Sequence, residues 1–320
     1  MGRRARYRCN AMKIIQKLLK CCQQATPCLS FEYYPPKDRA NWPAFYDKVQ
    51  RMSALAPDFI DVTWGTGNPT SLDSLEISQA IQAVTGIDTM MHLTCTHRSQ
   101  SELMEILSHV KEQAGIQNIM ALRGNRPQEG DWQPTPNGFD SAAALVAGIR
   151  SHFGDYFSIA VAGYPEGHRE DGRVCDPGYI RTQGYYAELD YLKRKIDAGA
   201  DFVITQLCFD LDQLSRYRDD CHQHGITCPI IPGILPLHSR QVWDRIATFS
   251  ASIPEALAHE YSRVANADSD SFERFAVDLL SSQLSRLHKE GFWAVHLYTL
   301  NHEKIISQYL SQERTAKLHS

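Results

Sequence analysis

The segment DAGADFVITQLC, residues 197–208, gives the clearest indication of the fold. A helical pattern begins at residue 187, and Gly199 ends it because glycine readily adopts the left-handed conformation found after helices. The short apolar run at 201–208 that follows is typical of a buried strand. The segment EQAGIQNI, residues 112–119, has the same order of helix, glycine and strand. Both segments indicate helices that lead directly into strands.

The same alternation continues along the chain from residue 29. Apolar runs predict eight strands, at 29–34, 58–64, 88–95, 116–123, 156–163, 201–208, 228–235 and 292–298. Amphipathic stretches predict helices at 45–55, 72–84, 102–114, 142–152, 187–198, 211–222 and 272–289. Strands that alternate with helices imply a parallel sheet, and eight such units over about 290 residues favour a (β/α)8 TIM barrel over an open doubly wound sheet. No GxGxxG motif follows the first strand, which weakens the Rossmann alternative.

The sequence predicts a single α/β catalytic domain at residues 29–320 and a basic extension at residues 1–28. The first 31 residues contain Arg and Lys but no Asp or Glu. That composition is also found in mitochondrial presequences. We interpret the extension as a short helix that caps the domain, with Ile14, Ile15, Leu18 and Leu19 on its apolar side. The expected location is the cytoplasm, and mitochondrial targeting is the alternative.

The bulk composition excludes several classes of partner. The net charge of −4 provides no positive field for nucleic acid or anionic membranes. No apolar run approaches the roughly 20 residues of a membrane span. The nine cysteines are odd in number and show neither a CxxC pair nor zinc-finger spacing, so we expect free thiols in a reducing compartment. Metal binding or lipidation at Cys21-Cys22 is the alternative.

Glu32 interrupts the apolar strand of CLSFEYYPPKD, residues 28–38, which Pro35 and Pro36 end. A carboxylate is costly to bury without a partner or a task. In a barrel, Glu32 would lie near the carboxyl end of the first strand, at the face where active sites are built. The long polar connections at 124–138 and 164–182 also follow strands and belong to that face.

The ends of the other predicted strands carry mainly hydroxyls, amides and aromatic rings. They are Thr63, Trp64, His92, Thr94, Arg123, Asn125, Tyr164, His168, Gln206, Tyr298, Thr299 and Asn301. His92 and His168 alone do not make a metal site, so none is predicted. No GxSxG or HExxH motif occurs. Such a set favours a large planar ligand, and it suits a flavin and a pterin.

These residues resemble the methylenetetrahydrofolate reductase family, in its flavin-binding catalytic domain. The matching motifs occur in family order across residues 29–312. They are SFEYYPP (30–36), DFIDVTWGTGNPTSLDSLE (58–76), HLTCTHRS (92–99), ALRGNRP (121–127), VAGYPEGH (161–168), LKRKIDAGADFVITQLCFD (192–210), GITCPIIPGILPL (225–237) and HLYTLN (296–301). AGYPEGH together with GADFVITQ is most similar to eukaryotic members. The animal-type regulatory domain that binds S-adenosylmethionine is not expected in residues 1–320.

The resemblance implies reduction of 5,10-methylenetetrahydrofolate to 5-methyltetrahydrofolate. FAD would carry a hydride taken from NADH or NADPH in a ping-pong cycle. Glu32 matches the family's catalytic acid, which delivers a proton near the folate amine nitrogen. Gln206 matches the pterin-binding glutamine, and Leu300 falls on another substrate-contact position. Family barrels often assemble as dimers or tetramers, so a homo-oligomer is expected.

The resemblance also assigns flavin contacts. They are Thr63, Trp64, His92, Leu122, Arg123, Gly124, Asn125, Tyr164, His168, Arg194 and Lys195. Without the resemblance, we would interpret Arg194 and Lys195 as part of a solvated helix face. We would likewise interpret His92 as a buried core histidine. Asn125 replaces a family aspartate that contacts the substrate and lies near the flavin, and residues 67–76 lack the arginines usual there. Two alternatives stay open: a relative with another reaction direction or one-carbon substrate, and a catalytically decayed flavin- or folate-binding partner subunit.

Overall fold

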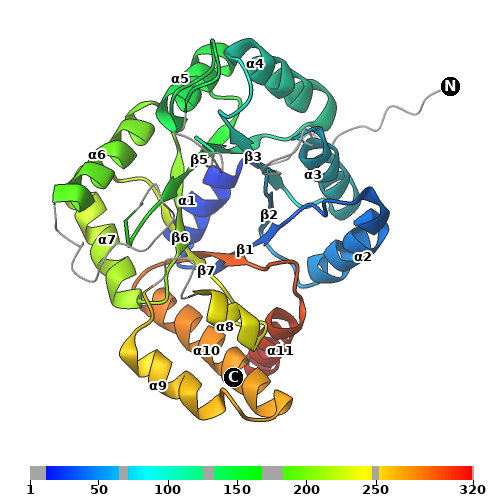
Figure 1. Cartoon of the computed structure of the whole chain (residues 1–320), viewed down its shortest axis with the longest axis vertical. Coiled ribbons are helices and arrows are strands. Elements are labelled where there is room, and N and C mark those ends of the chain that lie inside the picture. The colour runs from blue at the N-terminus through cyan, green and yellow to red at the C-terminus, as the bar shows by residue number, and fades with distance from the viewer. Residues whose placement is uncertain (1–11, 65–70, 125–132, 168–182, 247–251, 319–320) are drawn as a thin grey trace.

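The computed structural model describes residues 12–64, 71–124, 133–167, 183–246 and 252–318. Eight parallel strands form a closed barrel in which each strand pairs with the next and β8 pairs with β1 (Figure 1). The predicted (β/α)8 barrel and all eight predicted strands are therefore confirmed. The strands are β1 (Cys28–Tyr33), β2 (Phe59–Val62), β3 (Thr89–Thr94), β4 (Asn118–Leu122), β5 (Ser158–Gly163), β6 (Phe202–Leu207), β7 (Ile230–Ile234) and β8 (Ala294–Tyr298).

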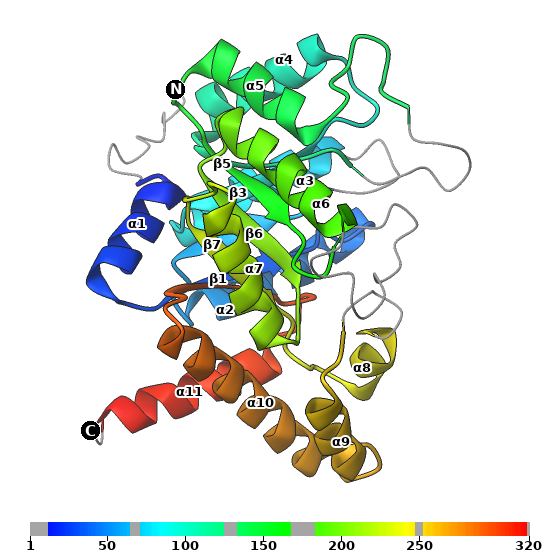
Figure 2. The same cartoon turned by 90° about the vertical axis from the view of Figure 1, so that its left-hand side faces the viewer.

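The described helices lie around the outer face of the barrel, except the first, which lies at one end of it (Figure 1 and Figure 2). They are α1 (Ile14–Gln24), α2 (Trp42–Ser53), α3 (Ser71–Thr85), α4 (Gln100–His109), α5 (Ala142–Phe153), α6 (Gln183–Asp197), α7 (Leu211–Gln223), α8 (Arg240–Ile246), α9 (Glu255–Val264), α10 (Ser269–Lys289) and α11 (Lys304–Leu318). A 3₁₀ turn at Arg39–Asn41 precedes α2, and a π-helical turn at Val110–Ala114 extends α4. None of the described helices is long and apolar enough to cross a membrane.

No helix range was predicted from the sequence for α8, α9 or α11. The first has seven residues, too few to show a helical period. In the second, Leu257 is buried and Tyr261 packs against the same core four residues later, so an apolar stripe of helical spacing was present. In α11 the buried residues are Ile305, Ile306 and Tyr309, and their helical spacing could have predicted this helix from the sequence.

The helix α1 lies at the amino-terminal end of the barrel (Figure 2). Ile14 and Leu18 are fully buried in one cluster with inward-facing residues of the strands. The main-chain N–H of Ile14 donates to Oδ1 of Asn118 at 2.9 Å, and Lys17 forms an ion pair of 2.7 Å with Asp88. The hydrogen bond to Asn118 satisfies one of the main-chain N–H groups that have no partner within the first turn of a helix. The helix therefore closes this end of the barrel.

The barrel interior changes character along its axis. Its amino-terminal half is filled by apolar side chains, namely Phe59, Met90, Met120, Phe202 and Ile204 with others of the same cluster. Two residues further along the same strands, on the same inner face, the side chains are often polar. They include Glu32, Asp61, His92 and Gln206. The polar half lies at the carboxyl ends of the strands, where barrel enzymes bind their substrates.

Gly233 of β7 has no space for a side chain. A Cβ atom there would lie 2.4 Å from the main-chain oxygen of Thr205 and 2.5 Å from Cε2 of Tyr298. Because one of these atoms is main chain, the strands would have to move. We expect Gly233→Ala to lower the free energy of unfolding by about 1–3 kcal/mol, the usual cost of overpacking. Urea unfolding measures this, and an unchanged midpoint would contradict the close approach of β6 and β8 to Gly233.

Candidate active site

Three side chains converge inside the polar half of the barrel, each from a different strand. Glu32 lies on β1, Asp61 on β2 and His92 on β3, and they are 3%, 0% and 8% exposed. Nε2 of His92 lies 2.6 Å from Oδ2 of Asp61 and 3.9 Å from Oε2 of Glu32. The hydroxyl of Thr299 donates to the main-chain oxygen of Glu32 and fixes the end of β1.

Burial and neighbouring charges set the protonation of this group. Burial raises the pKa of Glu32 to about 8, although His92 opposes that rise and Asp61 adds to it. Burial alone would lower the pKa of His92, but the charge of Asp61 and the hydrogen bond to it outweigh burial and raise that pKa. At neutral pH, Glu32 therefore keeps its proton beside the hydrogen-bonded Asp61–His92 pair.

A serine and a second histidine extend the group toward β8. Oγ of Ser30 lies 2.8 Å from Nδ1 of His296, and Nε2 of His296 lies 3.7 Å from Oδ2 of Asp61. Burial lowers the pKa of His296 to about 4, so the ring is neutral at neutral pH. The sequence patterns did not single out these residues for the site.

A signal for these missed residues was available. Ser30, Asp61 and His296 each stand two positions before a residue that the sequence did place at the site. Residues two apart on a strand share a face. The period of two along each strand would therefore have identified all three.

Asp61 also completes a group that could hold a cation. One ligand atom from each of Glu32, Asp61 and His92 lies within 4.8 Å of the others, which is the one such group in the described part of the chain. Nε2 of His92 is already bonded to Asp61, and an ion would have to break that bond. The absence of a metal requirement stays a prediction.

Two of the residues predicted to contact folate, Gln206 and Leu300, lie on β6 and after β8. Gln206 follows Phe202 and Ile204 at intervals of two on β6, so its exposed amide points into the barrel mouth. Leu300 is partly buried and has a positive φ of 47°. The side chain of Asn301, next in the chain, bonds both main-chain groups of Tyr34 at 2.9 and 2.8 Å. This clamp joins the loop after β8 to the end of β1.

A second polar cluster surrounds Lys195, in the last turn of α6. The ammonium group is buried and donates to the main-chain oxygen of Ala162 at 2.6 Å. It lies 5.1 Å from the ring of Tyr191 and 5.8 Å from that of Tyr164. Burial lowers the pKa of Lys195 to about 8, although Glu188 opposes this.

The predicted cations Arg123 and Arg194 belong to the same region. The charge of Arg123 is close enough to lower the pKa of both Tyr164 and Tyr191, against the dominant effect of burial. Arg194 is exposed and lies 5.3 Å from the ring of Tyr191. The structure thus brings Arg123, Tyr164, Arg194 and Lys195 together.

The remaining predicted residues follow β2 and β4. Thr63 is buried, and its N–H donates to the main-chain oxygen of Tyr33 at 3.0 Å. The side chain of Trp64 packs in the outer core between sheet and helices. Leu122 ends β4, and Gly124 has a φ of 97°. A Cβ atom at Gly124 would lie 2.6 Å from Oγ1 of Thr96, so this turn requires glycine.

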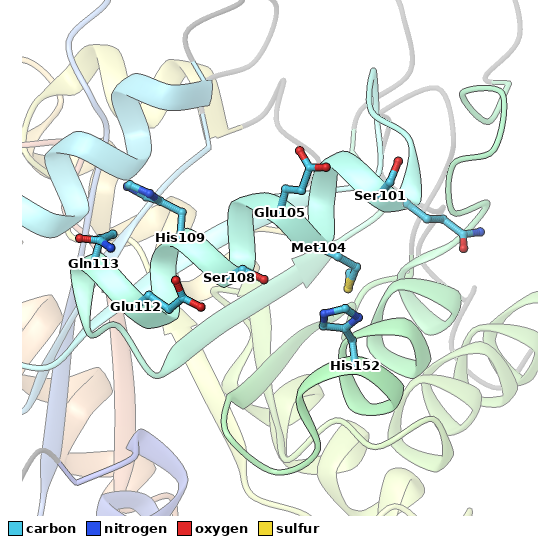
Figure 3. A pocket seen from close by; sticks show the side chains of 9 residues that line it. Ser101, Met104, Glu105, Ser108, His109, Glu112, Gln113 and His152 are labelled. Atoms are coloured by element: carbon cyan, nitrogen blue, oxygen red, sulfur yellow. The ribbon is translucent and has the colours of Figure 1, made fainter.

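Two predicted site residues, Asn125 and His168, lie outside the described residues. A cavity of about 610 Å³ occurs elsewhere, along α4 and its π-helical turn (Figure 3). Its lining includes Met104, Glu105, Glu112 and His152, but none of the predicted site residues. It is an open groove on the outer helices, so its size does not mark it as the catalytic centre.

Comparison with known proteins gives consistent matches. The family model described as methylenetetrahydrofolate reductase matches residues 16–314. The chain is 37% identical over 295 residues to "Methylenetetrahydrofolate reductase (NADH) 1" of Zea mays, covering 92% of this chain and 49% of that protein. It is 33% identical over 278 residues to "5,10-methylenetetrahydrofolate reductase" of Pectobacterium carotovorum subsp. carotovorum, covering 87% of each. The chain therefore spans about half the length of the maize relative and most of the bacterial one.

Solved structures agree on the fold. A protein from Clostridium thermocellum, described as binding two copies of 5-methyl-5,6,7,8-tetrahydrofolic acid, has a TM-score of 0.64 with 13% identity, covering 95% of this chain and 100% of that one. At that identity the likeness shows the fold alone. The family match rests on sequence, over nearly the whole barrel. This chain belongs to the methylenetetrahydrofolate reductase family.

Proposed function

We propose that the chain catalyses the FAD-dependent reduction of 5,10-methylenetetrahydrofolate to 5-methyltetrahydrofolate, with NADH or NADPH as the reductant. The observation that carries this proposal is the carboxyl group of Glu32, which is buried on the inner barrel face and protonated at neutral pH. An acid that works at neutral pH needs a pKa in that range. Family membership supports the substrate and the reaction type.

Glu32 supplies the proton that the reaction consumes. Reduction adds a hydride to the methylene carbon and breaks its bond to one folate nitrogen. That nitrogen gains a proton, and the methylene group becomes a methyl group. Glu32 donates this proton and is left as a carboxylate, 3.9 Å from the imidazole of His92. The proton is then restored from solvent before the next turnover.

The Lys195 cluster fits the demands of FAD. A dinucleotide diphosphate needs cations, and Lys195 is a buried cation whose ammonium group donates to the main-chain oxygen of Ala162. Arg123 and Arg194 lie near Tyr191, as Lys195 does, and Gly124 lets the chain after β4 turn tightly. FAD, when bound, would supply the hydride-transfer chemistry, while these residues hold and orient it.

Gln206 and Leu300 would receive the pterin. The side-chain amide of Gln206 offers a donor and an acceptor, which match the amide-like edge of a pterin ring. Its Oε1 accepts a hydrogen bond from the N–H of Leu207 at 3.1 Å, which holds the amide in one orientation. Leu300 adds an apolar contact beside the Asn301 clamp.

We expect the purified protein to be yellow, with one FAD per barrel. Anaerobic NADH or NADPH should bleach the flavin absorbance, and the faster of the two identifies the physiological reductant. Absorbance spectra measure the bound FAD, and stopped-flow traces measure the rate of its reduction by NADH and by NADPH. Colourless protein that takes up neither FAD nor FMN on titration would contradict the proposal, and preferential uptake of FMN would correct the cofactor.

The folate half-reaction should slow as the pH rises through about 8. Above the pKa of Glu32, which burial raises to about 8, the donor is a carboxylate without its proton. The rate therefore falls about tenfold for each further pH unit until another step limits it. Reoxidation of the reduced enzyme by methylenetetrahydrofolate across pH 6–10 measures this. A rate that is flat above pH 8 would exclude Glu32 as the donor.

A further inference from the structure

Asp61 is the most deeply buried charged side chain of the candidate active site, and the reaction proposed above gives it no role. It is 0% exposed. Its Oδ2 lies 2.6 Å from Nε2 of His92 and 3.7 Å from Nε2 of His296. Its Oδ1 has no hydrogen-bond partner among the described residues. A buried carboxylate is costly unless a cation compensates it, so Asp61 needs one.

His92, rather than His296, supplies that cation. Burial lowers the pKa of His296 to about 4, and its Nδ1 is bonded to Ser30. In His92 the charge of Asp61 and the hydrogen bond to it overcome burial and raise the pKa. At neutral pH, therefore, His296 is neutral, and His92 is the ring whose positive charge Asp61 favours.

The Asp61–His92 bond also fixes the ring opposite Glu32. Oε2 of Glu32 lies 3.9 Å from the same Nε2, which is beyond hydrogen-bond reach but within strong Coulombic range. When Glu32 gives up its proton, a carboxylate forms in a site that water barely reaches. A positively charged His92 stabilises that carboxylate, whereas a neutral imidazole leaves it exposed to the effects of burial and of the negative charge of Asp61.

We propose that Asp61 is a positioning residue that acts through His92, fixing its ring beside Glu32 and keeping it positively charged during proton transfer. The inference rests on the proposed role of Glu32 as proton donor. Asp61 itself transfers no proton to the substrate. The other titratable groups near Glu32 are the phenols of Tyr34 and Tyr298, whose pKa values burial raises, so they remain neutral.

Asp61→Asn tests the proposal because it removes the charge and keeps an oxygen that can accept a hydrogen bond from His92. We expect the pKa of His92 to fall, since burial then dominates. An NMR titration measures it, with the His92 signals assigned by their loss in His92→Gln. The rate constant of the folate half-reaction should fall roughly tenfold to a hundredfold, as for a weakened general acid, while the Kd for folate changes little.

Two further variants separate positioning from packing. When Asp61→Asn is added to His92→Gln, the rate constant of the folate half-reaction should fall by less than about a further twofold. A residue that acts through His92 has no effect once His92 is gone. Ser30→Ala is the matched control: Ser30 is buried on the same inner face but is bonded to His296. It should leave the titration of His92 unchanged.

An unshifted His92 titration in Asp61→Asn, or additive losses in the double variant, would overturn the proposal. Asp61→Ser, which removes the same charge, replaces Asp61→Asn if that variant does not fold by circular dichroism. The NMR titration does not depend on turnover. Suppose that Asp61→Asn lowers the pKa of His92 but that the wild-type protein cannot reduce methylenetetrahydrofolate. That result would support the Asp61–His92 coupling and contradict the proposed function.

Discussion

Glu32→Gln is expected to slow the folate half-reaction by about 10²–10⁴-fold, the usual contribution of a positioned acid. Glutamine preserves the size of the side chain but cannot donate a proton to the substrate. FAD binding and flavin reduction by NADH or NADPH should change by less than about twofold, because hydride transfer to the flavin does not consume the proton of Glu32. Stopped-flow measurement of each half-reaction separates the two effects.

Glu290→Gln is the matched control for this substitution. Glu290 is a partly buried carboxylate that precedes β8, at the opposite end of the barrel, where it binds Arg286 and Ser215. Its loss should leave both half-reactions unchanged. If Glu32→Gln slowed both half-reactions equally, Glu32 would be a structural residue and the assignment would be wrong.

Lys195→Gln is expected to weaken FAD binding by about 10–100-fold, the value of one hydrogen bond to a charged group. Glutamine keeps a side-chain N–H donor, but it is one bond shorter than lysine and carries no charge for a diphosphate. The unfolding midpoint should change little or rise, since a cation that is 3% exposed is costly to bury. Fluorescence titration of the apoprotein with FAD measures the affinity.

Lys193→Gln provides the comparison on the same helix. Lys193 is only two positions away but forms a surface ion pair with Asp197, one helical turn further along. Such pairs contribute little, so FAD affinity should be unchanged. Equal FAD affinity in the Lys195 and Lys193 variants would place the diphosphate away from the carboxyl end of β5.

The sequence predicted the barrel because its signal is local. In residues 197–208, helix, glycine and strand follow one another within a few positions, and the structure has α6 and β6 there. Glu32 was also identifiable, since a carboxylate in an apolar strand is conspicuous by itself. The seven residues of α8 were too few to show a comparable period.

The Asp61–His92 pair was not predicted, because contact between strands depends on register. Asp61 stands opposite Glu32 in the β1–β2 ladder, and this alignment arises from closure of the whole barrel. Within DFIDVTW, Asp61 lies in the middle of the predicted strand, and the site residues were predicted at strand ends such as Thr63. Its contact with His92 exists only because β2 and β3 pair in the barrel.

Anaerobic single turnover tests the central claim most directly, namely that the polar inner face around Glu32 reduces methylenetetrahydrofolate. The protein is first reduced with one equivalent of NADH or NADPH and then mixed with 5,10-methylenetetrahydrofolate. We expect the flavin absorbance to return while one 5-methyltetrahydrofolate forms per barrel. Absorbance that stays bleached, or returns without 5-methyltetrahydrofolate, would contradict the account.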